Sequence, residues 1–209
     1  MRLILASTSP RRKELLALLG FPFEVVAPAF DETVRKGLAP EEQARSFALG
    51  KARSCAAQFP HDVILGSDTL ISIDDEILGK PADARDAASM LRRLSGRLHL
   101  IHTSVALVRP AGGVEEVGLE TVRVRMKPLG DGEIETYVRT GEGSGKAGAY
   151  SIQGVGGGLI DGIEGDYTAA VGLPLRLVAD FLRTHGVPLS VDIAHLYQTK
   201  PFSNWAHFA

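Results

Sequence analysis

Two adjacent arginines, Arg11 and Arg12, follow a short polar segment near the start of the chain. An apolar run over 3–6 predicts a buried strand, and the stretch after it predicts a helix that begins at Pro10 with Ser9 as its N-cap. Cations in the first turn of a helix oppose its dipole and cost roughly 0.3–1 kcal/mol each when exposed. A bound polyanion reverses this effect, and the Ser7 and Ser9 hydroxyls would add neutral donors. The segment therefore indicates an anion site, but two solvated surface arginines would give the same pattern.

Two acidic residues have the surroundings of metal ligands. Asp68 stands between the apolar segments 62–66 and 70–73, which predict a buried strand that is interrupted at 67–69. Glu32 ends a loop that follows a predicted strand over 21–27. Carboxylates bind hard divalent cations, and such a cation with an oriented water can hydrolyse a phosphoanhydride. We therefore predict Glu32 and Asp68 as metal ligands.

Three lysines and one glutamine complete the candidate set. Lys51 falls on or beside the apolar stripe of a helix predicted over 40–59, where it either extends to solvent or meets a phosphate in a pocket. Lys80 precedes a proline that keeps it extended, Lys146 lies in the glycine-rich loop 141–148, and Gln153 ends a strand predicted over 149–153. Lysine and arginine would bind phosphate oxygens by charge-assisted hydrogen bonds.

Several other chemistries are disfavoured. The loop 141–148 resembles a Walker A motif, but Thr140 and Ala147 replace the required glycine and hydroxyl residue. The glycine run 154–158 is followed by Leu159 and lacks the third glycine of a dinucleotide fingerprint. No GxSxG motif supports a serine nucleophile. His99 and His102 lie three residues apart on a predicted strand, so they face opposite sides and make a poor metal pair.

The remaining pattern alternates helices and strands. Asp83 can cap a helix over 84–94, and helices are also predicted over 131–139 and 175–185. Two long runs, 98–108 and 116–126, predict an antiparallel pair of strands, and a further strand is predicted over 159–163.

Composition limits the class of protein. The 209 residues are 44% apolar and 23% charged, which is typical of a globular protein. The formal net charge of −2 argues against non-specific binding of nucleic acid or of a membrane surface. Cys55 is the single cysteine, and its apolar neighbours favour a buried thiol. The first apolar run is too short for a signal peptide, so we expect a cytoplasmic protein with neither a nucleic-acid nor a membrane partner.

Short motifs recur in a fixed order over about residues 2 to 185: LASTSPRRKELL from Leu5, GSDT from Gly66, GKP from Gly79, KAGAY from Lys146, IQG from Ile152 and VGLP from Val171. In this order they resemble the Maf family of nucleotide pyrophosphatases. The resemblance implies hydrolysis of a nucleoside triphosphate to the monophosphate and pyrophosphate with a divalent metal cation (Mg²⁺, Mn²⁺ or Co²⁺). It also implies the α/β fold of inosine-triphosphate pyrophosphatases, which we expect as a mixed twisted sheet flanked by helices around a central cleft.

The resemblance also assigns roles to individual residues. Asp68 matches the family's proton acceptor, and it would activate water for attack at the α-phosphorus. Arg11, Thr69 and Gln153 match three positions at which branches of the family differ, and this combination resembles the dTTP/UTP branch. We expect Gln153 and Thr69 to read the pyrimidine edge, while Arg11 helps to select the base. Arg11, Arg12, Lys51 and Lys80 would hold the triphosphate, with Ser7, Ser9 and Lys146 as further substrate-binding residues.

Three alternatives stay open: a 7-methyl-GTP pyrophosphatase of the same family, a non-catalytic nucleotide-binding regulator of cell division, and a phosphatase that releases orthophosphate. We expect housecleaning of modified pyrimidine nucleotides as the implied role. The chain divides into a Maf-like domain over 1–187 and a tail over 188–209 that follows no family pattern. Trp205, Phe202 and Phe208 in this tail would be costly to expose, so we expect them to pack on the body or across a homodimer.

Overall fold

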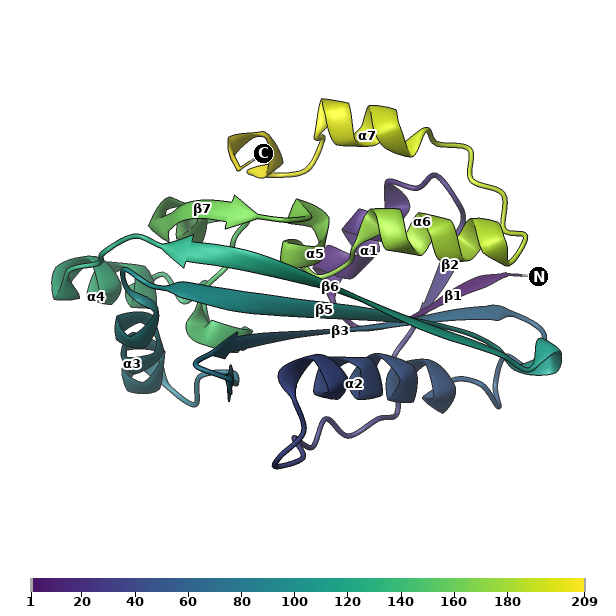
Figure 1. Ribbon diagram of the computed structural model, residues 1–209, viewed down its shortest axis with the longest axis horizontal. Helices are drawn as coiled ribbons and strands as arrows, with labels where there is room; N and C mark the ends of the chain where they lie inside the picture. Colours follow the sequence, from purple (N-terminus) through teal and green to yellow (C-terminus); the bar gives the residue numbers. More distant parts are fainter. Residues whose placement is uncertain (1, 209) are drawn as a thin grey trace.

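A seven-stranded mixed sheet forms the centre of the molecule in the computed structural model, which describes residues 2–208 (Figure 1). Its strands are β1 (Leu3–Ala6), β2 (Phe23–Val26), β3 (Val63–Ile73), β4 (Glu76–Leu78), β5 (Leu98–Arg109), β6 (Val114–Met126) and β7 (Ile160–Glu164). The strand order is β2-β1-β3-β5-β6-β7, with β4 paired to the end of β3. β1 runs parallel to β2 and β3, and the other pairs are antiparallel. The predicted mixed α/β fold is confirmed.

Helices cover both faces of the sheet because its strands are apolar on both sides. α2 (Pro40–Ser54) packs on the face that contains Ile4 and Ile64. α1 (Pro10–Ala17), α5 (Tyr167–Val171) and α6 (Leu175–Thr184) pack with Leu3 and Leu65 on the opposite face. Since successive strand residues face opposite sides, both clusters draw on the same strands. α3 (Ala84–Leu94) and α4 (Asp131–Arg139) lie together at one end of the sheet (Figure 1).

The unequal lengths of β1 and β3 leave an open edge in the middle of the sheet. β1 ends at Ala6, which pairs with Gly66, whereas β3 continues to Ile73. β4 joins this side of β3 only from Ile71 onward. The residues 67–70 therefore have no strand beside them there, although they pair with β5 on their other side. In mixed α/β sheets, ligands bind in crevices beyond the carboxyl ends of parallel strands, which is where this edge lies.

Several predicted boundaries differ from the structure. The helix predicted over 40–59 ends at Ser54, and the predicted interruption at 67–69 is wrong because these residues continue the ladder to β5. The strand predicted over 149–153 is also wrong. A 3₁₀ turn, η2 (Ala147–Ala149), and irregular chain replace it, because Gly148 and Ala149 adopt φ of 69° and 60°, outside the extended region. Ser9 occupies the N-cap position of α1, but its side chain makes no capping hydrogen bond.

The tail packs on the body of its own chain. It contains α7 (Ile193–Thr199) and the 3₁₀ turn η4 (Trp205–His207). Trp205 is 2% exposed, and its ring stacks on Tyr167 at a centroid distance of 5.8 Å. Trp205 is thus buried against its own chain, as predicted for the aromatic residues of the tail. A homodimer stays a prediction. Cys55 is buried, as predicted. Within residues 2–208, no helix has the length and apolar character needed to cross a membrane.

Candidate active site

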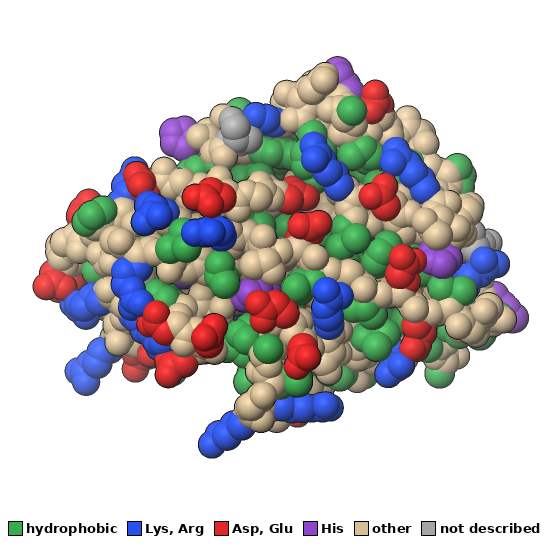
Figure 2. Space-filling view, viewed as in Figure 1, with side chains coloured by type: hydrophobic (Ala, Val, Ile, Leu, Met, Phe, Trp, Pro, Cys, Tyr) green, Lys and Arg blue, Asp and Glu red, His purple; other side chains and the backbone are tan. Residues whose placement is uncertain are grey.

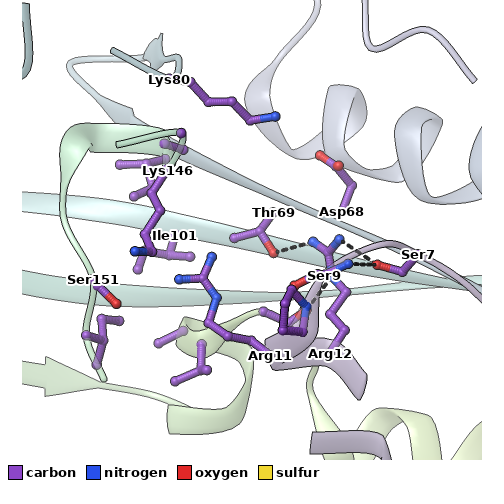
Figure 3. Close-up of a pocket in the computed structure, with 18 of the residues that line it drawn as sticks. Ser7, Ser9, Arg11, Arg12, Asp68, Thr69, Lys80, Ile101, Lys146 and Ser151 are labelled. Carbon is purple, nitrogen blue, oxygen red and sulfur yellow. Dashed lines mark hydrogen bonds between the residues drawn. The ribbon is translucent and has the colours of Figure 1, made fainter. Parts of the chain in front are cut away.

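A cavity of about 360 Å³ opens along the free edge of β3, beyond the end of β1 (Figure 3). Its walls come from the β1–α1 turn, the loop before α2, α2 itself, β3, the segment after β4, the segment 145–153 and the end of α5. All of the residues predicted from sequence line it: Ser7, Ser9, Arg11, Arg12, Glu32, Lys51, Asp68, Thr69, Lys80, Lys146 and Gln153. The structure thus brings together residues separated by up to about 70% of the chain length.

The open edge explains how two consecutive strand residues reach one cavity. Asp68 lies on the face of β3 that packs on α2, and Thr69 lies on the face toward α1 and α5. With no strand beside them on that side, both side chains border the same space. The cavity is therefore built around the edge of the sheet and receives groups from both of its faces.

Lys51 joins the two acids of the site. Its Nζ lies 2.5 Å from Asp68 Oδ1 and 2.6 Å from Glu32 Oε1, and its side chain is 7% exposed. The close approach of α2 to β3 at Gly66 makes this contact possible, because a Cβ on Gly66 would lie 2.3 Å from the carbonyl oxygen of Ala48. Lys51 therefore does not extend to solvent but lines the cavity, and its contact with a phosphate stays a prediction.

The second oxygen of Asp68 has a different environment. Asp68 Oδ2 is buried and has no hydrogen-bond partner among residues 2–208. A buried carboxylate oxygen without a partner is costly, and a water or a cation in the cavity would satisfy it. Asp68 therefore has one oxygen fixed by Lys51 and one available for chemistry.

Glu32 is held by the packing of its loop on α2. The Phe30 ring lies edge-on to Phe47 at 5.9 Å and passes over Gly50, where a Cβ would lie 2.1 Å from that ring. Burial opposes ionisation of Glu32, but the hydrogen bond and charge of Lys51 lower its pKa overall. Glu32 is therefore a carboxylate at neutral pH.

Arg12 is fixed by neutral acceptors. Its Nε donates to the carbonyl oxygen of Gly172 at 2.9 Å, Nη2 donates to Thr69 Oγ1 at 3.1 Å, and Nη1 lies 3.5 Å from Ser7 Oγ (Figure 3). Gly172 has φ of 125°, which a side-chain-bearing residue rarely adopts. Burial lowers the pKa of Arg12, and the charge of Asp68 partly offsets this effect. The guanidinium is therefore oriented without a direct ion pair among residues 2–208.

Positive charge exceeds negative charge around the cavity. Arg11 and Lys146 point toward one another across it, and Lys80 extends toward Asp68 (Figure 3). Burial lowers the pKa of Lys146, and the charge of Arg11 lowers it further. Burial also lowers the pKa of Arg11. Five basic side chains face two carboxylates here, so a bound polyanion would relieve the repulsion.

The donors present fit a divalent cation that is shared with a substrate. Residues 2–208 contain no group of three histidine, cysteine or acidic side chains arranged to hold a metal by themselves. Glu32 and Asp68 lie on either side of one ammonium group, and Asp68 Oδ2 is available. Mg²⁺ is often bound by one or two carboxylates together with substrate phosphates and water. The pair Glu32 and Asp68 has the chemistry for such a site.

An apolar wall was missed by the sequence analysis. Ile71, Ile101 and Ile152 line the cavity together with the ring of Tyr150. Tyr150 Oη lies 2.6 Å from His99 Nε2 within the core, and burial lowers the pKa of His99 to about 4. The alternation of β3 and β5 placed Ile71 and Ile101 on the face of Thr69, which was the available signal. The wall provides a surface on which a planar group can lie.

Two further observations concern the neighbouring strand β5. His99 and His102 face opposite sides, as predicted: His99 contacts Tyr150, whereas His102 Nε2 lies 2.9 Å from Ser72 Oγ. Thr103 does not line the cavity. Its hydroxyl lies 3.0 Å from Thr69 Oγ1, so it supports a residue that does.

Comparisons with known proteins agree with this architecture. Residues 2–185 match the family described as Maf-like protein. A dTTP/UTP pyrophosphatase of Symbiobacterium thermophilum is 48% identical over 188 residues, which cover 90% of this chain and 96% of the relative. A dTTP/UTP pyrophosphatase of Bacillus velezensis is 45% identical, with 83% of this chain and 91% of the relative covered. The Ham1 protein of Staphylococcus aureus shares the fold, with a TM-score of 0.52 and 14% identity, over 88% of this chain and 100% of that protein. On the family match and these identities, the chain belongs to the Maf family.

Proposed function

We propose that this protein hydrolyses dTTP and UTP, and modified pyrimidine analogues of them, to the nucleoside monophosphate and pyrophosphate. The names of its relatives support this activity. The observation that carries the proposal is the arrangement around Asp68: a carboxylate with one oxygen held by Lys51 and one available, facing a cavity with excess positive charge.

The phosphates would occupy the positively charged part of the cavity. Arg12 is already oriented by Thr69 and Gly172, so it can bind phosphate oxygens without losing much side-chain freedom. Lys80 and Lys146 reach the same space from two loops. Charge-assisted hydrogen bonds from these groups would hold the triphosphate and stabilise the charge that moves onto the leaving pyrophosphate.

Asp68 would act as the general base. Its Oδ2 would accept a proton from the attacking water, while Lys51 keeps Oδ1 in place. Glu32 and Asp68 would together hold a Mg²⁺, Mn²⁺ or Co²⁺ ion, which supplies Lewis-acid polarisation of the phosphates when bound. The Lys51 ammonium lies between the two carboxylates and reduces the repulsion between them before substrate arrives.

The base would lie on the apolar wall beside Gln153. A glutamine amide has both donor and acceptor groups, which suits the mixed pattern at a pyrimidine edge. Thr69 Oγ1 accepts a hydrogen bond from Arg12. Thr69 would therefore contact both the base and an arginine that binds the phosphates. Arg11 lines the same cavity and would help to select the base.

A hydrolysis panel tests the proposal. The wild-type protein is assayed with dTTP, UTP, 7-methyl-GTP and ITP at several Mg²⁺ and Mn²⁺ concentrations, and pyrophosphate and orthophosphate are measured separately. We expect pyrophosphate from dTTP and UTP. Preference for 7-methyl-GTP would indicate the other branch, release of orthophosphate would indicate a phosphatase, and saturable binding without product would indicate a regulator.

A further inference from the structure

The C-terminal tail contacts the segment that carries Gln153 from outside the cavity. Asn204 Nδ2 lies 2.9 Å from the carbonyl oxygens of Ile152 and Gln153, and 3.3 Å from that of Gly154. Ser203 Oγ donates to the Gln153 carbonyl oxygen at 3.0 Å. Both residues lie beyond residue 185, where the family match ends. Two tail residues therefore bind the backbone of a cavity-lining segment.

This support matters because the segment has no regular structure around Gln153. It lies between η2 and η3 (Val155–Leu159) and pairs with no strand in the described part of the chain. On either side it is held by Tyr137, which accepts from the Ser151 amide, and by Glu142, which accepts from the amides at 155 and 156. Within residues 2–208, Gln153 itself accepts hydrogen bonds only from Ser203 and Asn204.

The glycine run 154–158 provides room for this contact. A Cβ on Gly157 would lie 2.6 Å from Asn204 Nδ2, so a side chain there would exclude the amide. The run is not a nucleotide-phosphate loop of the dinucleotide type, which the sequence had already disfavoured. Gly157 leaves room for the Asn204 amide beside three consecutive carbonyl oxygens, whereas Gly154 and Gly156 lie against the side chain of Glu142.

Asn204 is itself held firmly. It adopts the left-handed conformation, with φ of 61°, directly before the buried Trp205. The carbonyl oxygen of Ser203 accepts a hydrogen bond from the Tyr167 hydroxyl, and the Tyr167 ring stacks on Trp205. Figure 1 shows the tail crossing above α6 and ending above β7 and α5. The side-chain amide of Asn204 is therefore held in place by the packed residues around it.

We propose that Asn204 is a positioning residue that fixes the backbone at Gln153 and thereby sets how this glutamine presents its amide to the nucleobase. The inference rests on the proposed function and adds to it a specificity element from the tail. Loss of the Asn204 amide loosens Gln153 without touching Asp68, Lys51 or the phosphate-binding cations. Base recognition then weakens while the chemical step is retained.

Two substitutions remove the amide donors in different ways. Asn204→Gly keeps the left-handed backbone, which glycine adopts readily, and Asn204→Asp keeps the shape but replaces donors with acceptors. Gln198→Ala is the matched control, because it removes an exposed carboxamide from the same tail. Ser203→Ala removes one of the two donors to Gln153 and provides a milder variant.

For both Asn204 variants we expect KM for dTTP and UTP to rise about 10-fold, which corresponds to about 1.4 kcal/mol, with kcat within twofold of wild type. Discrimination against 7-methyl-GTP falls in parallel. Calorimetric binding of a non-hydrolysable α,β-imido analogue of dUTP weakens by a similar factor. Ser203→Ala shifts both quantities in the same direction by about two- to threefold, and Gln198→Ala leaves them unchanged.

Unchanged KM and analogue affinity in a folded Asn204→Gly protein would overturn the inference. An equal loss of activity on all nucleotides, accompanied by a lower Tm and unchanged KM, would also overturn it, since that result describes a structural role alone. If the wild-type protein releases no pyrophosphate, the proposed function fails, and binding of the analogue to wild type and variants still decides the role of Asn204.

Discussion

At the scale of single residues, the site depends on one lysine placed between two acids. Lys51 is almost fully buried and contacts both Glu32 and Asp68, beside a cavity that is also lined by four other basic side chains. Breaking a buried ion pair by removing one partner is costly, whereas a neutral isostere retains much of the geometry. This difference allows the chemistry of Asp68 to be tested apart from its structural role.

Asp68→Asn is expected to lower kcat for dTTP by about 100- to 10,000-fold, because an amide cannot accept the proton of the attacking water. The fold should persist, since the amide oxygen can still accept from Lys51 and Glu32 still balances its charge. Steady-state kinetics and thermal unfolding measure the two effects. Asp161→Asn, at an exposed position, serves as the control, and wild-type kcat in Asp68→Asn would refute the assignment of the base.

The buried His99 predicts a specific pH dependence of stability. Its pKa is lowered by burial from 6.5 to about 4, so the unfolded chain binds a proton more readily than the folded protein between these values. This contribution is fully present above pH 6.5 and is lost as the pH falls toward 4. Between pH 7 and pH 4.5 it accounts for roughly 2 kcal/mol of the free energy of unfolding.

Urea unfolding of His99→Gln at these two pH values measures this contribution. The loss of stability from pH 7 to pH 4.5 should be smaller in the variant than in the wild type. His61→Gln, at an exposed position, should retain the full wild-type loss. Equal pH dependence in His99→Gln and the wild type would show that His99 is not buried in its neutral form.

At the scale of elements, the site forms where a short strand ends beside a long one. β1 stops opposite Gly66, and β3 continues past it with Asp68 and Thr69 on its two faces. α2 lies directly on Gly66, which brings Lys51 to Asp68. The difference in strand length leaves the edge of β3 open, and the packing of α2 on β3 brings the charged side chains to this edge. A loop motif alone would not assemble them.

Gly66→Ala therefore tests how the site is assembled. The added Cβ would meet backbone of α2, so α2 must shift, at a cost of about 1–3 kcal/mol or more in the free energy of unfolding. We also expect kcat to fall, because Lys51 moves with α2 away from Asp68. Gly162→Ala is the control, since a Cβ on this strand glycine meets no atom within 4 Å. Wild-type stability in Gly66→Ala would contradict the close packing.

Hydrophobic periodicity predicted the long elements well and the irregular ones poorly. The two runs at 98–108 and 116–126 are found as β5 and β6, since each is long and rich in residues that favour strands. The segment at 149–153 has strand-like composition, but positive φ at Gly148 and Ala149 turns the chain, which composition does not reveal. The contact between Lys51 and Asp68 was likewise missed, because it depends on the approach of α2 at Gly66.

At the scale of the whole molecule, the cavity differs from the rest of the surface in charge. Acidic and basic side chains are interspersed over the face shown in Figure 2, in keeping with a net charge of −2. Five basic side chains nevertheless converge on one cavity. The candidate residues could be gathered from the sequence because most of them stand at the ends of predicted strands or in loops. The support from the tail could not, because no motif in the tail indicates which backbone Asn204 contacts.

This local charge predicts that inorganic tripolyphosphate stabilises the folded protein without any metal. At a concentration of 100 times its Kd, the free energy of unfolding rises by about 2.7 kcal/mol, which corresponds to a rise in Tm of about 5–10 °C for a chain of this size. Arg12→Met should lose much of the shift, and Arg139→Met, at an exposed position on α4, should keep it. No shift in wild-type Tm at low ionic strength would contradict a polyanion site.

In the proposed reaction, water activated by Asp68 attacks the α-phosphorus of a pyrimidine nucleoside triphosphate. The most direct test is hydrolysis of dTTP in ¹⁸O-labelled water, with mass spectrometry of both products. We expect one ¹⁸O atom in dTMP and none in pyrophosphate. Label in pyrophosphate, or release of labelled orthophosphate, would place the attack on another phosphorus and refute attack at the α-phosphorus.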